Sequence, residues 1–433
     1  MKILKILQLA ATYLYRYRRR YFFLFLALVF GFGIVTVITS VKDGMYENVY
    51  FASQSHYAGD IVVLGYVKPV SSQVISGEYA AAVMQAAGDA RLYPDHTVKR
   101  TLFGNTGFLF FNGAAANLKY VLGVDWDAEA SYFNGIDYAE TPLAPLEGDE
   151  CIVLSAPVAK ALGARRGDSI TLEGETETGQ KNTAQYIISA VVNDSTIFGY
   201  YKAYVSRQSL NRFLGLGEEE CSTIGFYFND RRDIEEKKRA LQAELEKRAR
   251  TGPLVKSRAE LDRKAGRQWQ GTMLFVTSIP VLLSEVSELL DAINILTYFL
   301  YIMMLLIILV SAAVTFRLIL HERMKELGTM RAIGFYEADV AHVLVLETLG
   351  LGIFSLAGGF ITARVIVWGL GFLSFSWFPG FEIFMKDGRL TALYRVPATL
   401  VNVAAVFCML LAAVWLPAFR SVRNPLPRML QGL

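Results

Sequence analysis

The strongest constraint on the fold is an uncharged run from Tyr21 to Val41. Three arginines precede this run and Lys42 follows it. A hydrocarbon core of about 30 Å needs roughly 20 helical residues, so the run predicts a transmembrane helix. A secretory signal would have a shorter apolar segment and a small-x-small cleavage site, and the segment from Thr39 to Lys42 does not fit such a site. We therefore expect an uncleaved membrane anchor.

Three further apolar segments predict additional spans: residues 289–316, 343–368 and 396–416. Glu347 and Arg364 are the charged residues of the second of these segments, and each is expected to reach the interface from near one end. The chain is 53% hydrophobic with a mean hydropathy of +0.33, which is high for a soluble protein and modest for a pure membrane bundle. These values predict a soluble domain beside a membrane part.

Basic residues give the predicted orientation. They form one cluster before the first span, one between the second and third spans, and one after the fourth span: Lys2, Lys5, Arg16, Arg18, Arg19, Arg20; Arg317, Arg323, Lys325, Arg331; and Arg420, Arg423, Arg428. All three clusters fall on one side, which the positive-inside rule makes cytoplasmic. We therefore expect both termini in the cytoplasm and the region from Lys42 to Glu288 outside.

The outer region reads as short strands and helices of a compact α+β domain. Strands are expected at 60–64, 97–103, 106–111, 118–124, 150–154, 169–172, 186–192, 203–205 and 224–228, and helices at 156–162 and 233–250. Met273 to Leu283 is too short to span, so an interfacial segment or a stalk packed on the bundle is expected there. The segment from Arg231 to Glu288 has no further assignment.

Composition and motifs exclude several functions. A net charge of +3 gives no reason to expect nucleic-acid binding. His321-Glu322-Arg323-Met324-Lys325 lacks the second histidine of a zinc-protease motif, and Gly174 to Lys181 misplaces the lysine of a phosphate loop. We expect no metal, no cofactor and no enzyme activity in this chain. Cys151 and Cys221 both lie in the outer region, and they form either one disulfide or two separate thiols.

The predicted cytoplasmic turn from Glu322 to Phe335 carries the most informative pattern. A short charged helix that continues from a membrane helix and ends at Gly334 would transmit displacement with little loss to loop flexibility. A basic interfacial connector that only sets topology is the alternative interpretation.

This turn resembles the loop of FtsX-like ABC transporter permeases, the family that contains the MacB type and the lipoprotein-releasing LolC and LolE type. The matching positions, implied to couple to an ATPase, are Glu322, Arg323, Lys325, Glu326, Leu327, Gly328, Arg331, Ala332 and Gly334, together with Ile333. Glu347, Pro417-Ala418 and Pro425 resemble other family positions. The outer domain resembles a MacB-like periplasmic core at Gly148-Asp149-Glu150, Ala159, Leu162-Gly163 and Gly167-Asp168.

The resemblance implies a four-helix transmembrane permease with a large extracytoplasmic α+β domain inserted between the first and second spans. The expected division is a cytoplasmic interfacial segment 1–20, span 21–41, a MacB-like domain with stalk 42–288, span 289–316, a cytoplasmic coupling loop 317–342, span 343–368, an outer loop 369–395, span 396–416 and a cytoplasmic tail 417–433. The expected location is the cell inner membrane.

The same resemblance implies the partners. A separate cytoplasmic ABC ATPase would bind ATP and Mg²⁺, and a second copy or a related permease would complete a homodimer or heterodimer in the lipid bilayer. Lys42 to Met45 and Gly59 to Val63 resemble lipoprotein-releasing members, which favours lipoprotein release, with a lipoprotein or a periplasmic adaptor as a further partner. MacB-like efflux of peptides or small molecules, an FtsX-like transmitter that regulates an outer cell-wall enzyme, and a receptor without an ATPase remain as alternatives.

Overall fold

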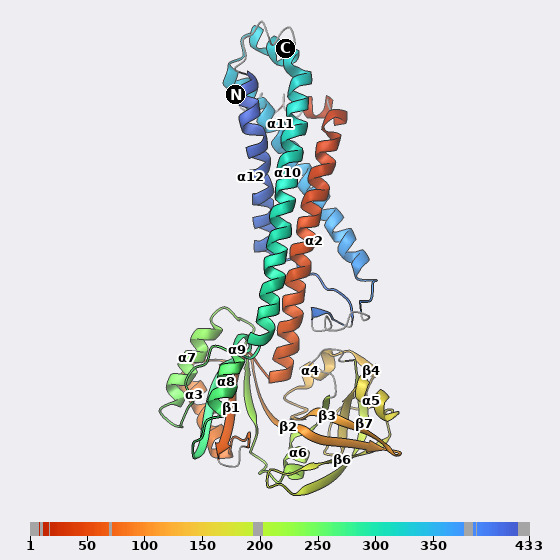
Figure 1. Cartoon of the computed structure of the whole chain (residues 1–433), viewed down its shortest axis with the longest axis vertical. Helices are drawn as coiled ribbons and strands as arrows, with labels where there is room; N and C mark the ends of the chain where they lie inside the picture. Colours follow the sequence, from red (N-terminus) through yellow and green to blue (C-terminus); the bar gives the residue numbers. More distant parts are fainter. Residues whose placement is uncertain are drawn as a thin grey trace. The chain divides into compact units, whose positions relative to one another are not determined.

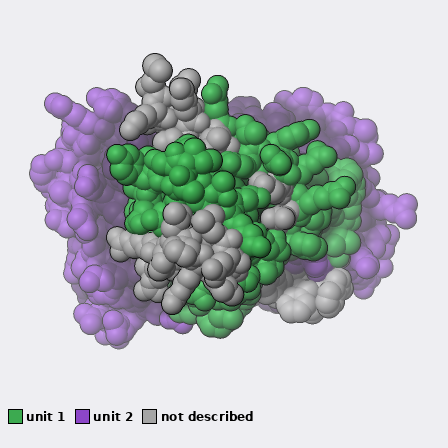
Figure 2. Space-filling model, turned by 90° about the horizontal axis from the view of Figure 1, so that it is seen from above, with its two compact units in different colours: residues 1–46, 291–374, 389–433 green, residues 47–290, 375–388 purple. Residues whose placement is uncertain are grey.

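The computed structural model describes residues 8, 12–16, 18–68, 72–193, 202–375, 384–386 and 388–422. The chain divides into two compact units, which Figure 2 shows in green and purple. Unit 1 comprises residues 1–46, 291–374 and 389–433, and unit 2 comprises residues 47–290 and 375–388. Pro425 and the basic residues Lys2, Lys5, Arg423 and Arg428, which contributed to the sequence predictions, lie outside the described residues.

Unit 1 is built from long apolar helices, and two of these helices have one end in unit 2 (Figure 1). The helices are α2 (Arg18–Tyr57) and α10 (Ser284–Ala332), which belong in part to unit 2, and α11 (Glu337–Leu370) and α12 (Val396–Val422). Within the described residues, four helices are long and apolar enough to cross a membrane, and they contain the four predicted spans. Each helix extends beyond its predicted span; α2 continues past Val41 to Tyr57, and α10 continues past Phe316 to Ala332.

Two glycines allow close helix packing in unit 1. A Cβ on Gly31 of α2 would lie 2.6 Å from the side chain of Ile308 on α10. A Cβ on Gly359 of α11 would lie 2.8 Å from the backbone oxygen of Val29 on α2. Small residues let helix backbones approach each other within a membrane. These two positions therefore bring α2 close to both α10 and α11.

Polar contacts also join α2 to its neighbours within unit 1. The Nδ2 atom of Asn294 on α10 donates to the Tyr46 hydroxyl at 2.6 Å. The Nδ2 atom of Asn402 on α12 donates to the Thr39 hydroxyl at 2.9 Å. Such bonds stabilise a bundle where the surrounding medium offers no water as a partner.

Unit 2 contains a ten-stranded sheet in the described part of the chain, with the order β10-β1-β9-β2-β3-β8-β5-β7-β4, and β6 pairs with β2 and β7. The strands are β1 (Ile61–Lys68), β2 (His96–Phe111), β3 (Ala114–Val124), β4 (Tyr138–Glu140), β5 (Cys151–Ser155), β6 (Ser169–Glu175), β7 (Lys181–Val192), β8 (Lys202–Ser206), β9 (Thr223–Tyr227) and β10 (Gly271–Ser278). The helices are α3 (Gly77–Asp89), α4 (Ala130–Gly135), α5 (Ala156–Leu162), α6 (Arg207–Leu214), α7 (Ile234–Leu245), α8 (Arg258–Ala265) and α9 (Ile279–Leu282).

Separate hydrophobic clusters stabilise different parts of this sheet. One packs α3 and α7 against β1, β9 and β10, and includes Ile61, Val83 and Leu241. Another packs α5 and α6 against β2, β3 and β5 to β8, with Ile152 and Leu210 among its fully buried residues. Burial of such side chains is the main favourable contribution to folding. The domain therefore has the α+β architecture that the sequence predicts.

The predicted interfacial segment or stalk at Met273 to Leu283 is wrong. Most of it forms β10, an edge strand that pairs antiparallel with β1 from Ile61↔Ser278 to Lys68↔Gly271, and Pro280 lies at the start of α9. The end of β10 is buried without alternation, so its apolar run cannot be distinguished from a short buried helix by periodicity. The segment 231–288, most of which the sequence left without an assignment, thus forms α7, α8, β10 and α9, and β10 completes one end of the sheet.

Other sequence-based elements agree more closely with the structure. The predicted helix at 156–162 matches α5 (Ala156–Leu162), and its C-cap Gly163 has a φ of 67°. The strands expected at 97–103 and 106–111 are one strand, β2, with a change of register between Gly104 and Gly107. The helix expected at 233–250 is shorter, and Ile234, Leu241 and Leu245 lie on its buried face.

The structure decides between the two interpretations of the outer cysteines. Cys151 and Cys221 are both free and buried, and they belong to different hydrophobic clusters. Burial raises the pKa of the Cys221 thiol to about 11 and also raises the pKa of Cys151. Both residues therefore act as small apolar core side chains.

Candidate functional site

The candidate site is the turn between α10 and α11, which we call the elbow and define as residues 322–337. As predicted, α10 continues as helix through the charged segment and ends before Gly334, which has a φ of +106°. The Phe335 amide donates to the Met330 oxygen and the Gly334 amide donates to the Arg331 oxygen, at 3.2 and 3.0 Å. This is a Schellman motif, in which glycine supplies the left-handed residue that terminates the helix.

The elbow has a buried face and an exposed face. The buried residues are Arg323, Met324, Leu327, Gly328 and Met330. The exposed residues are Glu322, Lys325, Thr329, Ala332, Ile333, Gly334, Phe335, Tyr336 and Glu337, while Glu326 and Arg331 are half-buried. Helical spacing accounts for this division, because positions three and four apart share a face. The nine predicted coupling residues therefore do not form one surface.

Arg323 forms a buried ion pair that joins three helices. Its Nη1 and Nη2 atoms lie 2.5 and 3.3 Å from the two carboxylate oxygens of Glu347 on α11. The Tyr21 hydroxyl on α2 donates to Glu347 Oε2 at 2.7 Å and accepts from Arg323 Nη1 at 3.2 Å. Bidentate arginine–carboxylate geometry fixes orientation as well as distance. We call Tyr21, Arg323 and Glu347 the inner clamp.

The inner clamp corrects one expectation from the sequence. Glu347 does not reach the interface, because it is 1% exposed and is paired inside the bundle. Arg323 is also 1% exposed and lies over the Tyr13 ring at 5.0 Å, so its predicted part in ATPase coupling would act through the helix bundle. Moving a charged side chain from water into the bundle costs free energy unless the charge is paired and hydrogen-bonded there. Both charges of the inner clamp meet this condition. Their role is to join α2, α10 and α11.

A second ion pair closes the elbow at the surface. The Nη2 atom of Arg331, in the last turn of α10, lies 2.7 Å from Oε1 of Glu337 in the first turn of α11. A cation near a helix C-terminus and an anion near an N-terminus each interact favourably with the helix dipole. Because this ion pair is partly solvated, it contributes at most about 1 kcal/mol to the free energy of unfolding.

The tip of the elbow presents apolar side chains outside the bundle core. Ile333 is 76% exposed, Tyr336 is 74% exposed and Phe335 is 39% exposed. Lys325 and Glu322 lie on the exposed face of the preceding helical turns. An apolar patch with charged residues around it is typical of a protein contact surface.

In unit 2, the end of α2 is fixed to the sheet by Asp60, which is fully buried at the start of β1. Its Oδ1 atom accepts from the Tyr50 hydroxyl at 2.7 Å, and its Oδ2 atom accepts from Gln54 Nε2 at 2.9 Å and from the Phe228 amide at 2.7 Å. Tyr50 and Gln54 are one helical turn apart on α2. One carboxylate therefore joins α2 to the β1–β9 part of the sheet.

Arg100 on β2 makes a second connection to the end of α2. Its Nη1 atom donates to the backbone oxygens of Ser55 and His56, which are terminal carbonyls of the helix. Its Nε atom donates to Glu129 at 2.9 Å, and both side chains are almost fully buried. A cation at a helix C-terminus satisfies carbonyls that lack an intrahelical partner. We call Asp60, Arg100 and Glu129 the outer anchor.

Sequence reasoning missed Tyr21, Arg100 and Asp60 as connecting residues. Tyr21 is the first residue of an uncharged run, where an aromatic residue indicates the membrane interface. Arg100 and Glu129 are far apart in sequence and match no motif. Within the described residues, no group of His, Cys, Asp and Glu side chains could hold a metal ion.

Comparison with known proteins identifies both parts of the chain. Residues 22–244 match the model of the MacB-like periplasmic core domain, which covers more than half of the chain. Residues 298–426 match the model of the FtsX-like permease C-terminal region. No curated protein matches the chain.

Two solved structures are similar to the outer domain at low identity. The extracellular domain of the noncanonic ABC-type transporter YknZ from Gram-positive bacteria is 10% identical, with a TM-score of 0.29, covering 49% of this chain and 98% of that one. The periplasmic region of MacB from Actinobacillus actinomycetemcomitans is 10% identical, with a TM-score of 0.31, covering 54% of this chain and 95% of that one.

The two family models together account for the order of elements along the chain. A periplasmic core domain lies between an N-terminal helix and a C-terminal permease region, and four candidate membrane helices accompany them. The chain therefore belongs to the FtsX/MacB-type family of ABC transporter permeases.

Proposed function

We propose that this permease transmits ATP-driven motion of a separate cytoplasmic ATPase to its outer domain in order to release or export lipoproteins. The observation that carries the proposal is the elbow, whose exposed apolar tip directly follows α10, the helix that the buried inner clamp ties to α2. The FtsX-like family consists of permease components of ABC transporters, which act with a cytoplasmic ABC ATPase.

The first step is contact with the ATPase. Ile333 and Tyr336 would insert into an apolar groove of the partner, and Lys325 and Glu322 would form the charged rim. The Schellman turn and the Arg331–Glu337 pair fix the shape of the tip before contact, which lowers the entropy cost of binding.

The second step is transfer from α10 to α2. A bidentate ion pair with a shared tyrosine hydroxyl resists relative sliding of the three helices, because any displacement leaves a buried charge without its partner. Displacement of the elbow would therefore move α2 and α11 with α10.

The third step is delivery to the outer domain. The helix α2 runs without a break from Arg18 to Tyr57, so Tyr21 of the inner clamp and Tyr50 of the Asp60 network lie on the same continuous helix. A helix is stiff along its axis, whereas a loop would absorb displacement. The outer anchor would then pass motion from α2 to β1 and β2.

The choice of lipoprotein as cargo is supported by the resemblance of Lys42 to Met45 and Gly59 to Val63 to lipoprotein-releasing members. Photo-crosslinking from the outer domain during ATP turnover tests it. Recovery of a lipoprotein would support the proposal. Recovery of a peptide or small molecule would favour efflux, and recovery of only a cell-wall hydrolase would favour signal transmission.

ATPase stimulation by the reconstituted permease tests the elbow. We expect Ile333→Asp with Tyr336→Asp to reduce stimulation at least about tenfold, because both apolar anchors are lost. Glu326→Lys with Arg331→Glu should also uncouple the ATPase while membrane insertion stays intact. The matched control is Lys181→Asp, an exposed charge reversal in the outer domain. Full stimulation by both elbow variants would contradict the proposal.

A further inference from the structure

The outer domain consists of two lobes that share the long strand β2. Residues 96–100 of β2 pair with β9, whereas residues 101–111 pair with β3 and in part with β6. We call residues 58–100 and 221–282 the β9 lobe, and residues 101–220 the β3 lobe. One hydrophobic cluster draws all of its members from the β9 lobe, and two others draw all of theirs from the β3 lobe. Each lobe therefore has its own core, as a body that moves separately requires.

The chain passes between the lobes at two points, and these points lie next to each other. One is at residues 100–101 within β2, and the other is at residues 220–221, just before β9. Ser222 joins them, because its amide donates to the Arg100 oxygen at 2.8 Å and its hydroxyl accepts from the Leu102 amide at 3.0 Å. Two adjacent strands that connect two compact bodies have the geometry of a hinge.

A buried ion pair holds the two lobes together beside this hinge. Arg100 is the last residue of β2 in the β9 lobe, and Glu129, which directly precedes α4, belongs to the β3 lobe. The Arg100 Nε atom donates to the two carboxylate oxygens of Glu129 at 2.9 and 3.2 Å, and each side chain is 2% exposed. Rotation of one lobe against the other would separate two buried charges, which is strongly unfavourable.

The same guanidinium also caps α2. Its Nη1 atom donates to the backbone oxygens of Ser55 and His56, while its Nη2 atom pairs with Glu129. The donors of an arginine lie in one plane at fixed angles, so the group cannot follow one partner without turning away from the other. A displacement of α2 that moves Ser55 and His56 would therefore disturb the pairing of Arg100 with Glu129.

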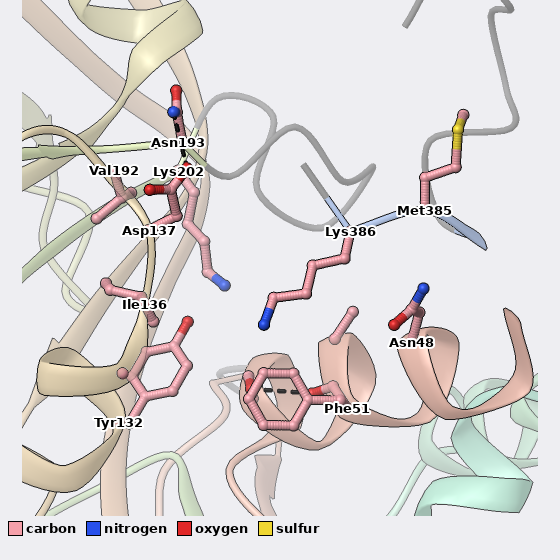
Figure 3. Close-up of a pocket in the computed structure, with 13 residues that line it drawn as sticks. Asn48, Phe51, Tyr132, Ile136, Asp137, Val192, Asn193, Lys202, Met385 and Lys386 are labelled. Atoms are coloured by element: carbon pink, nitrogen blue, oxygen red, sulfur yellow. Dashed lines mark hydrogen bonds between the residues drawn. The ribbon is translucent and has the colours of Figure 1, made fainter. Parts of the chain in front are cut away.

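The contact between α4 and the β9 lobe leaves room for movement. A cavity of about 230 Å³ lies beside Glu129, with one wall from the α4 segment and the other from α2, β2 and β9. Phe51 on α2 and Tyr132 on α4 line this cavity and also a neighbouring pocket, where Figure 3 shows both side chains. Close packing between the lobes would resist rotation, whereas open space beside the ion pair does not.

We propose that the outer domain bends at residues 100–101 and 220–221, and that the Arg100–Glu129 ion pair is the lock that holds the two lobes together. With the lock intact, the lobes move as one body. When the lock is broken, the β3 lobe rotates about the two adjacent strands, and α4 moves relative to α2. This hinge is a property of the outer domain, so it depends neither on the ATPase partner nor on the cargo.

Pulsed electron paramagnetic resonance on the full chain in lipid nanodiscs measures the distance between the lobes. Spin labels are attached at Ala243→Cys on α7 and Lys160→Cys on α5, two exposed positions, in a Cys408→Ser background. The two buried cysteines of the outer domain stay unlabelled. A second label pair, Lys160→Cys with Thr178→Cys, lies within the β3 lobe and reports whether this lobe keeps its fold.

Two variants break the lock. Glu129→Gln removes one charge, whereas Arg100→Met with Glu129→Met removes both and so leaves no charge buried alone. We expect each variant to broaden the distance distribution between the lobes at least about twofold and to leave the distribution within the β3 lobe unchanged, because only the hinge is released. The matched control is Lys99→Met, which breaks the exposed Lys99–Glu219 ion pair between the same lobes and should change neither distribution.

Two results would overturn the proposal. An unchanged distribution between the lobes in both lock variants would mean that the ion pair does not hold them together. Equal broadening within the β3 lobe and between the lobes would mean that the ion pair supports the fold of the domain and that no hinge exists.

Discussion

Arg323 shows how a residue within a surface motif can have a buried, connecting role. The family pattern places it two residues from Lys325, which is exposed, and two residue steps on a helix rotate the side chain by about 200°. Its partner Glu347 lies on the next helix, and Tyr21 lies on α2. A motif defined along the chain cannot reveal such a three-helix contact.

We expect Arg323→Met to lower the free energy of unfolding by about 3–5 kcal/mol, because Glu347 would remain buried without its partner. Arg323→Met with Glu347→Leu should recover most of this loss, since both charges are removed. Denaturant titration of the protein in detergent measures the difference. The control Arg331→Met breaks the half-exposed ion pair with Glu337 and should lower the free energy of unfolding by at most about 1 kcal/mol. Equal effects of the two single variants would contradict the inner clamp.

Burial of the outer cysteines makes them unreactive. Since the pKa of Cys221 rises from 9.0 to about 11, it stays a thiol at pH 8, and its contribution to stability is lost only as the pH rises from about 9 through 11. In Cys408→Ser protein, N-ethylmaleimide should label Cys151 and Cys221 at least about a hundredfold faster after unfolding than before. Thr178→Cys provides an exposed positive control. Rapid native labelling at pH 8 would contradict this burial.

At the scale of elements, the end of α2 depends on a residue from another part of the chain. Arg100 donates to the carbonyls of Ser55 and His56, and Glu129 compensates its charge. Gly59 follows α2 and its amide donates to the Gln54 oxygen at 3.0 Å, but the α2 sequence does not indicate the additional cap, because that cap comes from β2. The predicted span ended at Val41, where the hydrophobic pattern ends, although the helix itself continues.

We predict that Arg100→Met frays the last turn of α2. Amides of residues 54–57 should exchange with deuterium at least about tenfold faster, because the carbonyls of Ser55 and His56 lose their charged donor and the last turn of the helix opens more often. Lys99→Met is the matched control, since Lys99 precedes Arg100 on β2 and pairs with the exposed Glu219. Unchanged exchange at 54–57, or an equal increase over the whole sheet, would contradict the outer anchor.

The sequence predicted a helix or strand well where the signal, amphipathic periodicity or a capping residue, lies within or next to that element. The helix α5 and its glycine cap were located from Ala156 to Gly163. The strand β10 was missed because its last five residues are all buried, so they show no alternation. The sequence also could not predict that β10 pairs with β1, because most of the outer domain separates the two strands along the chain.

At the scale of the whole molecule, the sequence predicted four apolar helices, an α+β domain between the first two, and the family. What it could not predict is which residues connect these parts. The elbow residues divide into a buried and an exposed set, and α2 carries both Tyr21 and Tyr50. Such connections depend on tertiary contacts, which leave no periodic signal in one sequence.

The central claim is that the tip of the elbow contacts an ATPase in the cytoplasm. Photo-crosslinking from position 333 in sealed inner-membrane vesicles, with the adducts identified by mass spectrometry, tests it most directly. Position 298 on the exposed membrane face of α10 serves as the matched control. We predict a covalent adduct between position 333 and an ABC ATPase subunit, and none from position 298. Absence of an ATPase adduct at 333, or labelling of that position from outside the cell, would contradict the account.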